Sequence, residues 1–97
     1  MFFQKIIIKS NIKIYHIKWT ENEYNDIELE PDNDLFILYR KTNNIRYDNI
    51  KLYYELLQTS NIFNFQMSNK YKHEIIIMIR YEDDKYKIYI DDKDINA

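Results

Sequence analysis

The sequence contains no cysteine and no glycine, and Pro31 is its single proline. Without cysteine the chain can form no disulfide, thiolate nucleophile or zinc-thiolate site. Without glycine it cannot build phosphate-cradling loops, the dinucleotide fingerprint or the nucleophile elbow, because these need backbone conformations that glycine alone adopts easily. Valine is also absent, whereas 18 isoleucines, 11 asparagines and 11 lysines are present. This pattern is typical of an AT-rich genome.

The length of 97 residues indicates one domain, residues 1–97, with a single core. An apolar fraction of 45% and an aromatic fraction of 16% exclude a disordered chain. The net charge of -2 implies neither a wholly basic nucleic-acid binder nor a strongly acidic mimic. Lys5 and Lys9 interrupt the apolar N-terminus, and apolar runs such as Ile75–Ile79 are far too short for a membrane span. We therefore expect a soluble cytoplasmic protein.

Two regions of the N-terminal half predict strands. The stretch from Phe3 to Trp19 is rich in β-branched and aromatic residues, which predicts either two strands or one long bent strand, with a break at Ser10–Asn11. As a two-residue turn, Ser10–Asn11 would close a hairpin in which Ile7 lies opposite Ile14. In the first of them Lys5 shares a face with Ile7, so neither face is cleanly polar. That pattern fits a sheet contacted on both sides, and it equally fits lysine stems lying along an apolar surface. The apolar run Leu35–Tyr39 predicts a buried strand in the middle of the sheet.

The region after residue 47 predicts one amphipathic helix. Asp48 can act as the N-cap of a helix over residues 49–59. The apolar stripe at helical spacing consists of Ile50, Tyr53, Tyr54 and Leu57. The following segment, Asn61–Phe65, fits either a loop with buried aromatics or a short edge strand.

The C-terminal third predicts a β-hairpin. With Asp83–Asp84 as the two turn residues, Tyr81 faces Tyr86, Ile79 faces Ile88 and Ile77 faces Ile90 on one side. The predicted fold is therefore α+β, in the order βββαββ. A mainly antiparallel sheet of about five strands would carry the single helix packed on it. The polar tail at residues 91–97 is expected to fray.

Residues 20–34 form an acidic segment with seven acids, no base and the single proline. We interpret this segment as a loop that either is simply solvated or recognises a basic surface of another protein. Trp and Tyr are enriched at binding hot spots, so Tyr15 and Trp19 are expected to contact the same partner, although Trp19 at its strand end equally fits a core position. The predicted partner-binding residues are Tyr15, Trp19, Glu21, Glu23, Asp26, Glu28, Glu30, Asp32 and Asp34.

No catalytic residue, metal site or cofactor is predicted. His16 and His73 lie far apart in sequence, and neither has another ligand at metal-binding spacing. Asp32 with the later Asp83-Asp84-Lys85 resembles a nuclease metal site only superficially, because the second group falls in the predicted hairpin turn.

The sequence favours a non-enzymatic protein-binding module. We expect an inhibitor or immunity-type protein, of the kind that phages and mobile elements encode, which occupies a surface of a target enzyme. One alternative is single-stranded nucleic-acid binding through the N-terminal strands. The residues that suggest it are Lys5, Lys9, Lys13, Lys18, Tyr15, His16 and Trp19. A second alternative is a homo-oligomer that pairs exposed strand edges.

Overall fold

The chain folds into strands alone. The computed structural model describes residues 2–20, 22–42, 47–68 and 73–94, and 75% of these described residues are in strands, with no helix among them. Accordingly, no helix in the described ranges is long and apolar enough to cross a membrane. The predicted α+β fold is wrong, and the protein is all-β.

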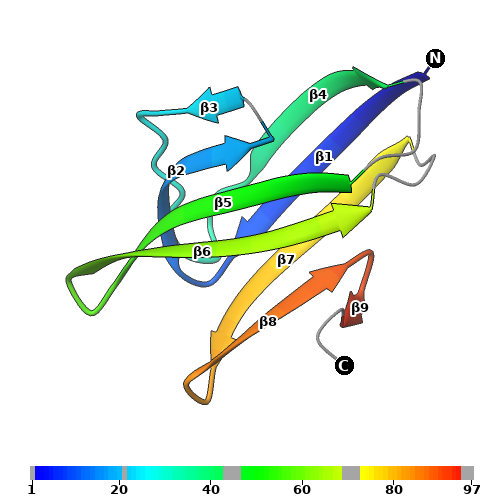
Figure 1. The fold of residues 1–97 in the computed structure, drawn as a ribbon. Coiled ribbons are helices and arrows are strands. Elements are labelled where there is room, and N and C mark those ends of the chain that lie inside the picture. The colour runs from blue at the N-terminus through cyan, green and yellow to red at the C-terminus, as the bar shows by residue number, and fades with distance from the viewer. Residues whose placement is uncertain (1, 21, 43–46, 69–72, 95–97) are drawn as a thin grey trace.

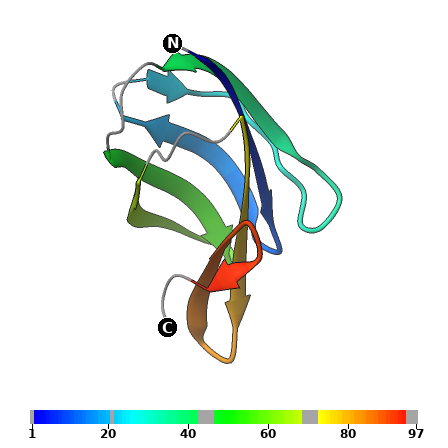
Figure 2. The ribbon, with the colours of Figure 1, turned by 90° about the vertical axis from the view of Figure 1, so that its right-hand side faces the viewer.

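Two sheets form the layers of a sandwich (Figures 1 and 2). The five-stranded sheet has the order β4-β1-β7-β8-β9, and β1 and β7 are its parallel pair. Its strands are β1 (Phe2–Ser10), β4 (Phe36–Thr42), β7 (Glu74–Glu82), β8 (Lys85–Ile90) and β9 (Lys93–Asp94). The four-stranded sheet is antiparallel, in the order β3-β2-β5-β6. Its strands are β2 (Lys13–Trp19), β3 (Asn22–Tyr24), β5 (Tyr47–Leu56) and β6 (Thr59–Ser68).

Isoleucine fills the space between the sheets. Side chains alternate across a strand, so every second residue of β1 and β7 points inward. The five-stranded sheet contributes Ile6, Ile8, Ile75, Ile77, Ile79 and Ile88, and the four-stranded sheet contributes Ile14, Ile17, Ile50, Leu52 and Met67. Burying one such side chain stabilises the fold by about 1.5–3 kcal/mol before the loss of entropy is counted.

The predicted helix is strand β5. Ile50 and Leu52 point into the core while Lys51 lies between them on the outer face, which is a period of two. Leu57, expected on the buried stripe of the helix, is 90% exposed. It forms a two-residue turn with Gln58, both at positive φ, and β6 returns alongside β5. The segment Asn61–Phe65 is therefore part of a strand.

The predicted hairpin of the first two strands is also wrong. At Ser10–Asn11 the chain leaves the five-stranded sheet and enters the four-stranded one, so β1 and β2 do not pair. The Asn11 side chain fixes this corner, because its amide donates to the Tyr81 carbonyl at 3.0 Å and accepts from the Tyr81 N–H at 2.7 Å. The N–H of Ile12 donates to the Ser10 hydroxyl at 3.0 Å.

Two strand predictions are confirmed, one of them only in part. The C-terminal hairpin has the predicted register, and its turn residues Asp83 and Asp84 both have positive φ. Leu35–Tyr39 largely coincides with β4, but β4 is an edge strand and not the middle of the sheet. The run is apolar on both faces because its outward side chains form an exposed surface, not because both faces are buried.

Candidate functional site

The acidic segment is fastened to the four-stranded sheet. Its residues 22–24 form β3, which pairs with the end of β2, and Leu29 forms a bridge with Ile14. Leu29 is buried, with backbone hydrogen bonds to Ile14 of 2.9 and 3.3 Å. Residues 25–34 are otherwise irregular, so the acidic segment is a loop that is anchored to the sheet at β3 and at Leu29.

Several of its acids already have partners within the protein. Glu23 lies 3.6 Å from the Lys18 amine, and Asp32 lies 2.7 Å from the Arg80 guanidinium. The Asp34 carboxylate accepts a hydrogen bond from the Glu30 N–H at 2.9 Å. The pKa of Arg80 is raised, first by its hydrogen bond to Glu82 and then by Asp32. The segment thus presents less free negative charge than its composition indicates.

The structure brings three predicted residues, Tyr15, Asp26 and Glu28, together. They line an open depression of about 570 Å³, together with His16, Asn25 and Ile27. The His16 ring stacks on Tyr53 with 4.2 Å between the ring centres. Glu30 is exposed elsewhere along the segment, and Glu21 lies outside the described residues.

Trp19 is a core residue. Its side chain is 1% exposed, so it cannot supply contact area to a partner. The expectation that it binds a partner together with Tyr15 is wrong, because strand alternation turns Trp19 inward at the end of β2. The Arg40 guanidinium packs 5.6 Å from the centre of its ring.

The four N-terminal lysines are divided between the sheets. Lys5 and Lys9 belong to β1 in the five-stranded sheet, and Lys13 and Lys18 belong to β2 in the four-stranded sheet. Because the two sheets point their outer faces in opposite directions, these lysines cannot follow one strand of nucleic acid. The geometry does not favour the nucleic-acid site predicted from the sequence.

A buried polar cluster connects the two sheets near one end of the sandwich. Arg40 of β4 forms an ion pair with Asp48 of β5, and the Asp48 side chain is 0% exposed. Arg40 also donates to the Gln4 side chain at 2.9 Å, while Thr20 donates to Asp48 at 3.3 Å. We interpret this arrangement as structural, because the charges of Arg40 and Asp48 compensate each other, and only Nη1 of Arg40 is a buried atom of these four side chains without a hydrogen-bond partner.

The outer face of the five-stranded sheet gathers most of the large apolar side chains that the described chain exposes. We call this surface the apolar–lysine face. It consists of Phe3, Lys5, Ile7, Lys9, Leu35, Ile37, Tyr39, Lys41, Ile76 and Met78. In the row across its centre, Ile7 of β1 lies opposite Ile37 of β4 and Ile76 of β7. A contiguous apolar surface of this kind marks an interaction site more often than scattered apolar residues do.

Lysines of β1 and β4 flank this apolar centre, and at one end of the face Asp32 and Asp34 line a hollow beside Lys9 and Leu35. The Lys5 amine lies 6.0 Å from the centre of the Tyr39 ring, and the Lys41 amine lies 5.2 Å from that of Phe3. Neither β1 nor β4 contains an acidic residue. The nearest acid in register is Glu74 of β7, beside Lys5. This half of the sheet therefore carries a positive charge next to its apolar centre.

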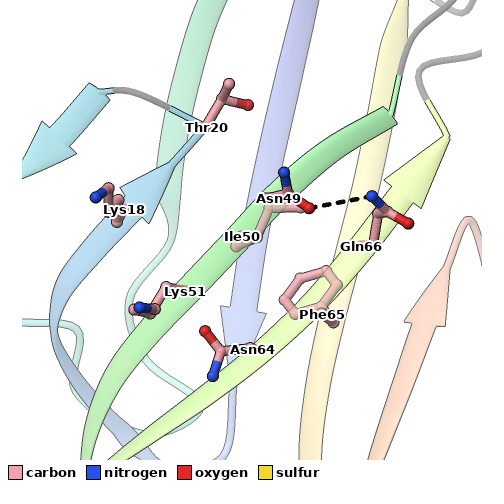
Figure 3. A pocket seen from close by; sticks show the side chains of 8 residues that line it. All are labelled: Lys18, Thr20, Asn49, Ile50, Lys51, Asn64, Phe65 and Gln66. Carbon is pink, nitrogen blue, oxygen red and sulfur yellow. Dashed lines mark hydrogen bonds between the residues drawn. The ribbon is translucent and has the colours of Figure 1, made fainter.

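The outer face of the four-stranded sheet has a different character (Figure 3). Its largest hollow, of about 580 Å³, is lined by lysines and amides, with Lys18 and Lys51 opposite each other in register. Asn49 accepts a hydrogen bond from Gln66 at 3.1 Å across β5 and β6. Ile62 is its large exposed aliphatic side chain. This face is polar and partly satisfied by its own contacts.

One sequence pattern pointed to the apolar–lysine face, namely the mixing of Lys5 with Ile7 on a single strand face. Nothing in the sequence indicated that β4 would lie beside β1 and add Ile37 and Tyr39. Among the described residues, no group of three or more His, Asp or Glu side chains could hold a metal ion. Scans against protein-family models, curated proteins and solved structures found no match to this chain.

Proposed function

We propose that this chain is a small non-enzymatic protein-binding module and that the apolar–lysine face is its binding surface. The observation that carries the proposal is the row Ile37–Ile7–Ile76, in which Ile37 and Ile76 are exposed and Ile7 is half-buried, with the lysines of β1 and β4 beside it. An inhibitor that covers a surface of a target enzyme would act in this way.

The partner that fits this face is a protein with an apolar centre and carboxylates around it. The burial of the aliphatic row would supply most of the affinity, as in the cores of known interfaces. Acids of the partner would meet Lys5, Lys9 and Lys41, which steers association and fixes orientation. This partner has the opposite charge to the one predicted from the sequence, because the large exposed apolar side chains of the described chain lie outside the acidic segment and mostly on the apolar–lysine face.

Single-stranded nucleic acid fits this face less well. Aliphatic side chains such as Ile37 and Ile76 cannot stack on bases as aromatic rings do. The exposed aromatics Phe3 and Tyr39 lie at one end of the face, and each already has a lysine amine near its ring.

A comparison of two charge-reversed variants tests the proposal. Lys5→Glu with Lys41→Glu changes the apolar–lysine face, and Lys13→Glu with Lys51→Glu makes the same change of net charge on the four-stranded sheet. Each immobilised protein is exposed to nuclease-treated lysate of the cells that make it, and the retained proteins are quantified by mass spectrometry. We expect a partner retained by the wild type and by the control pair but not by the face pair.

Two results would contradict the proposal. The first is a partner retained equally by both variants, or no specific partner at all. The second is binding of an oligothymidine strand that weakens steeply with salt and is lost in the face pair, which would assign the face to nucleic acid.

A further inference from the structure

The four outer edges of the sandwich differ in how they are protected against pairing with another strand. Natural sheets protect their edges with short strands, charged side chains, prolines or bulges. β3 has 3 residues and carries Glu23, and β9 consists of two charged residues, Lys93 and Asp94. β4 carries the inward charge of Arg40 and the outward charge of Lys41.

The fourth edge, β6, has none of these devices. It is 10 residues long and contains neither a charged residue nor a proline. Its register with β5 runs without a bulge from Thr59 to Ser68. Within the described part of the chain, β5 is the only strand that pairs with β6. The edge is therefore long, regular and uncharged.

The main-chain groups of this edge point outward at alternate residues. A two-residue turn closes on a hydrogen-bonded pair, here Leu56 and Thr59, and hydrogen-bonded pairs then alternate along the hairpin. The residues of β6 whose N–H and C=O groups face away from β5 are consequently Ser60, Ile62, Asn64 and Gln66. Their side chains are also exposed on the outer face.

We infer that β6 is a dimerisation edge, which pairs antiparallel with β6 of a second copy of this chain. A two-fold axis perpendicular to the sheet near Asn64 keeps the outer faces of both copies on one side. Ile62 of each copy then lies opposite Gln66 of the other, and Phe63 lies opposite Phe65. Because the strand is uncharged, this pairing brings no like charges together.

A second copy of this chain fits this edge because the two copies form a closed dimer, in which both β6 edges are paired. Pairing of β6 with β6 uses the one unprotected edge in both molecules, so that growth stops at a dimer and no fibre forms. The two four-stranded sheets join into one continuous sheet. The apolar–lysine face belongs to the other sheet and stays free, so the inference stands or fails independently of the proposed function.

The mass in solution tests this inference. Light scattering on the wild type across a dilution series is expected to give twice the 12.1 kDa of one chain at high concentration. Asn64→Lys places two lysines close together at the two-fold axis and is expected to halve the mass. The matched control Asn33→Lys adds the same charge at an exposed residue outside β6 and is expected to keep the dimer.

A wild type that stays monomeric throughout, or a dimer that Asn64→Lys leaves intact, would overturn the inference. Loss of the dimer in both variants would also overturn it, because the effect would then be one of net charge. Amide hydrogen exchange on the wild type gives a readout that does not depend on the folding of a variant. Protection of the Ser60, Ile62 and Asn64 amides should rise with protein concentration, and unchanged protection would contradict β6 pairing.

Discussion

The two outer faces of the sandwich are made by the same strand geometry but differ in chemistry. The four-stranded sheet presents lysines, amides and the Lys18–Glu23 ion pair, which interact with one another and with solvent. The five-stranded sheet exposes 67% of Phe3 and 69% of Tyr39 beside its aliphatic row. One face is stable in water as it stands, whereas the other leaves apolar surface that a partner can bury.

The largest expected effect on stability concerns the Arg40–Asp48 ion pair, which connects the two sheets behind both outer faces. Asp48→Asn leaves the Arg40 charge without its counter-ion between the sheets, and should lower the free energy of unfolding by about 3–5 kcal/mol in urea denaturation. The control Glu23→Gln removes the exposed pair with Lys18 and should cost no more than about 1 kcal/mol. Equal losses of unfolding free energy in Asp48→Asn and Glu23→Gln would show that the buried polar cluster of Arg40 and Asp48 does not connect the sheets.

Truncation of an isoleucine should affect stability differently on the inner and outer faces of the five-stranded sheet. Ile77 is 0% exposed and Ile76 is 39% exposed, although they are neighbours on β7. Ile77→Ala should lower the free energy of unfolding by about 2–5 kcal/mol through the cavity that it leaves. Ile76→Ala should cost about 1 kcal/mol or less and should instead weaken partner binding. Similar losses of stability in the two variants would contradict an exposed role for Ile76.

The hairpin turns of the two sheets should respond differently to turn residues that favour positive φ. Leu57 and Gln58 have φ of 53° and 63°, which side chains of their kind adopt at a cost. Leu57→Asn with Gln58→Gly should raise the free energy of unfolding by about 1–2 kcal/mol in urea denaturation. The same change at Asp83 and Asp84 should gain less, because Asp tolerates this conformation. An equal gain at both turns would refute this difference.

The smallest expected effect is on the pH dependence of stability at alkaline pH, and it involves Tyr54. Burial, and then the nearby Tyr81, raise the pKa of Tyr54 above its ordinary value of 10.0. Because the folded state favours the neutral phenol, this stabilisation is full below pH 10 and is lost as the pH rises through the raised pKa. Tyr54→Phe cannot ionise, so its melting temperature should fall less than that of the wild type above this pH. Parallel pH profiles would contradict the prediction.

The C-terminal hairpin could be predicted because two independent patterns agree there. The alternation of Ile75, Ile77 and Ile79 requires a strand, and Asp83–Asp84 can adopt the positive φ of a tight turn. A one-residue shift would have turned the isoleucines outward, so the register was determined as well.

The hairpin of β5 and β6 could not be predicted because its turn has no recognisable residue. Leu57–Gln58 contains neither glycine nor asparagine. The apolar residues of 50–57 fit both a helical spacing (Ile50, Tyr53, Tyr54, Leu57) and a period of two (Ile50, Leu52, Tyr54, Leu56). Tertiary pairing with β2 and β6 decides in favour of the strand. Trp19 was misassigned for a similar reason, because its inward direction depends on the pairing of β2 with β5.

The apolar–lysine face was inaccessible from sequence because it combines three strands that are distant in the chain. Ile7, Ile37 and Ile76 become neighbours only when β1 pairs antiparallel with β4 and parallel with β7. The acidic segment stood out in composition, yet two of its acids, Glu23 and Asp32, form ion pairs with Lys18 and Arg80 in the folded protein.

The most direct test of the apolar–lysine face as the binding surface is an NMR titration of isoleucine methyl groups with the retained partner protein. The isoleucines report on both outer faces in one experiment, since Ile7, Ile37 and Ile76 lie on the apolar–lysine face and Ile62 lies on the opposite one. We expect the methyl signals of Ile7, Ile37 and Ile76 to shift on binding, while that of Ile62 stays unchanged. Shifts confined to Ile62, with the three face signals unmoved, would contradict this expectation.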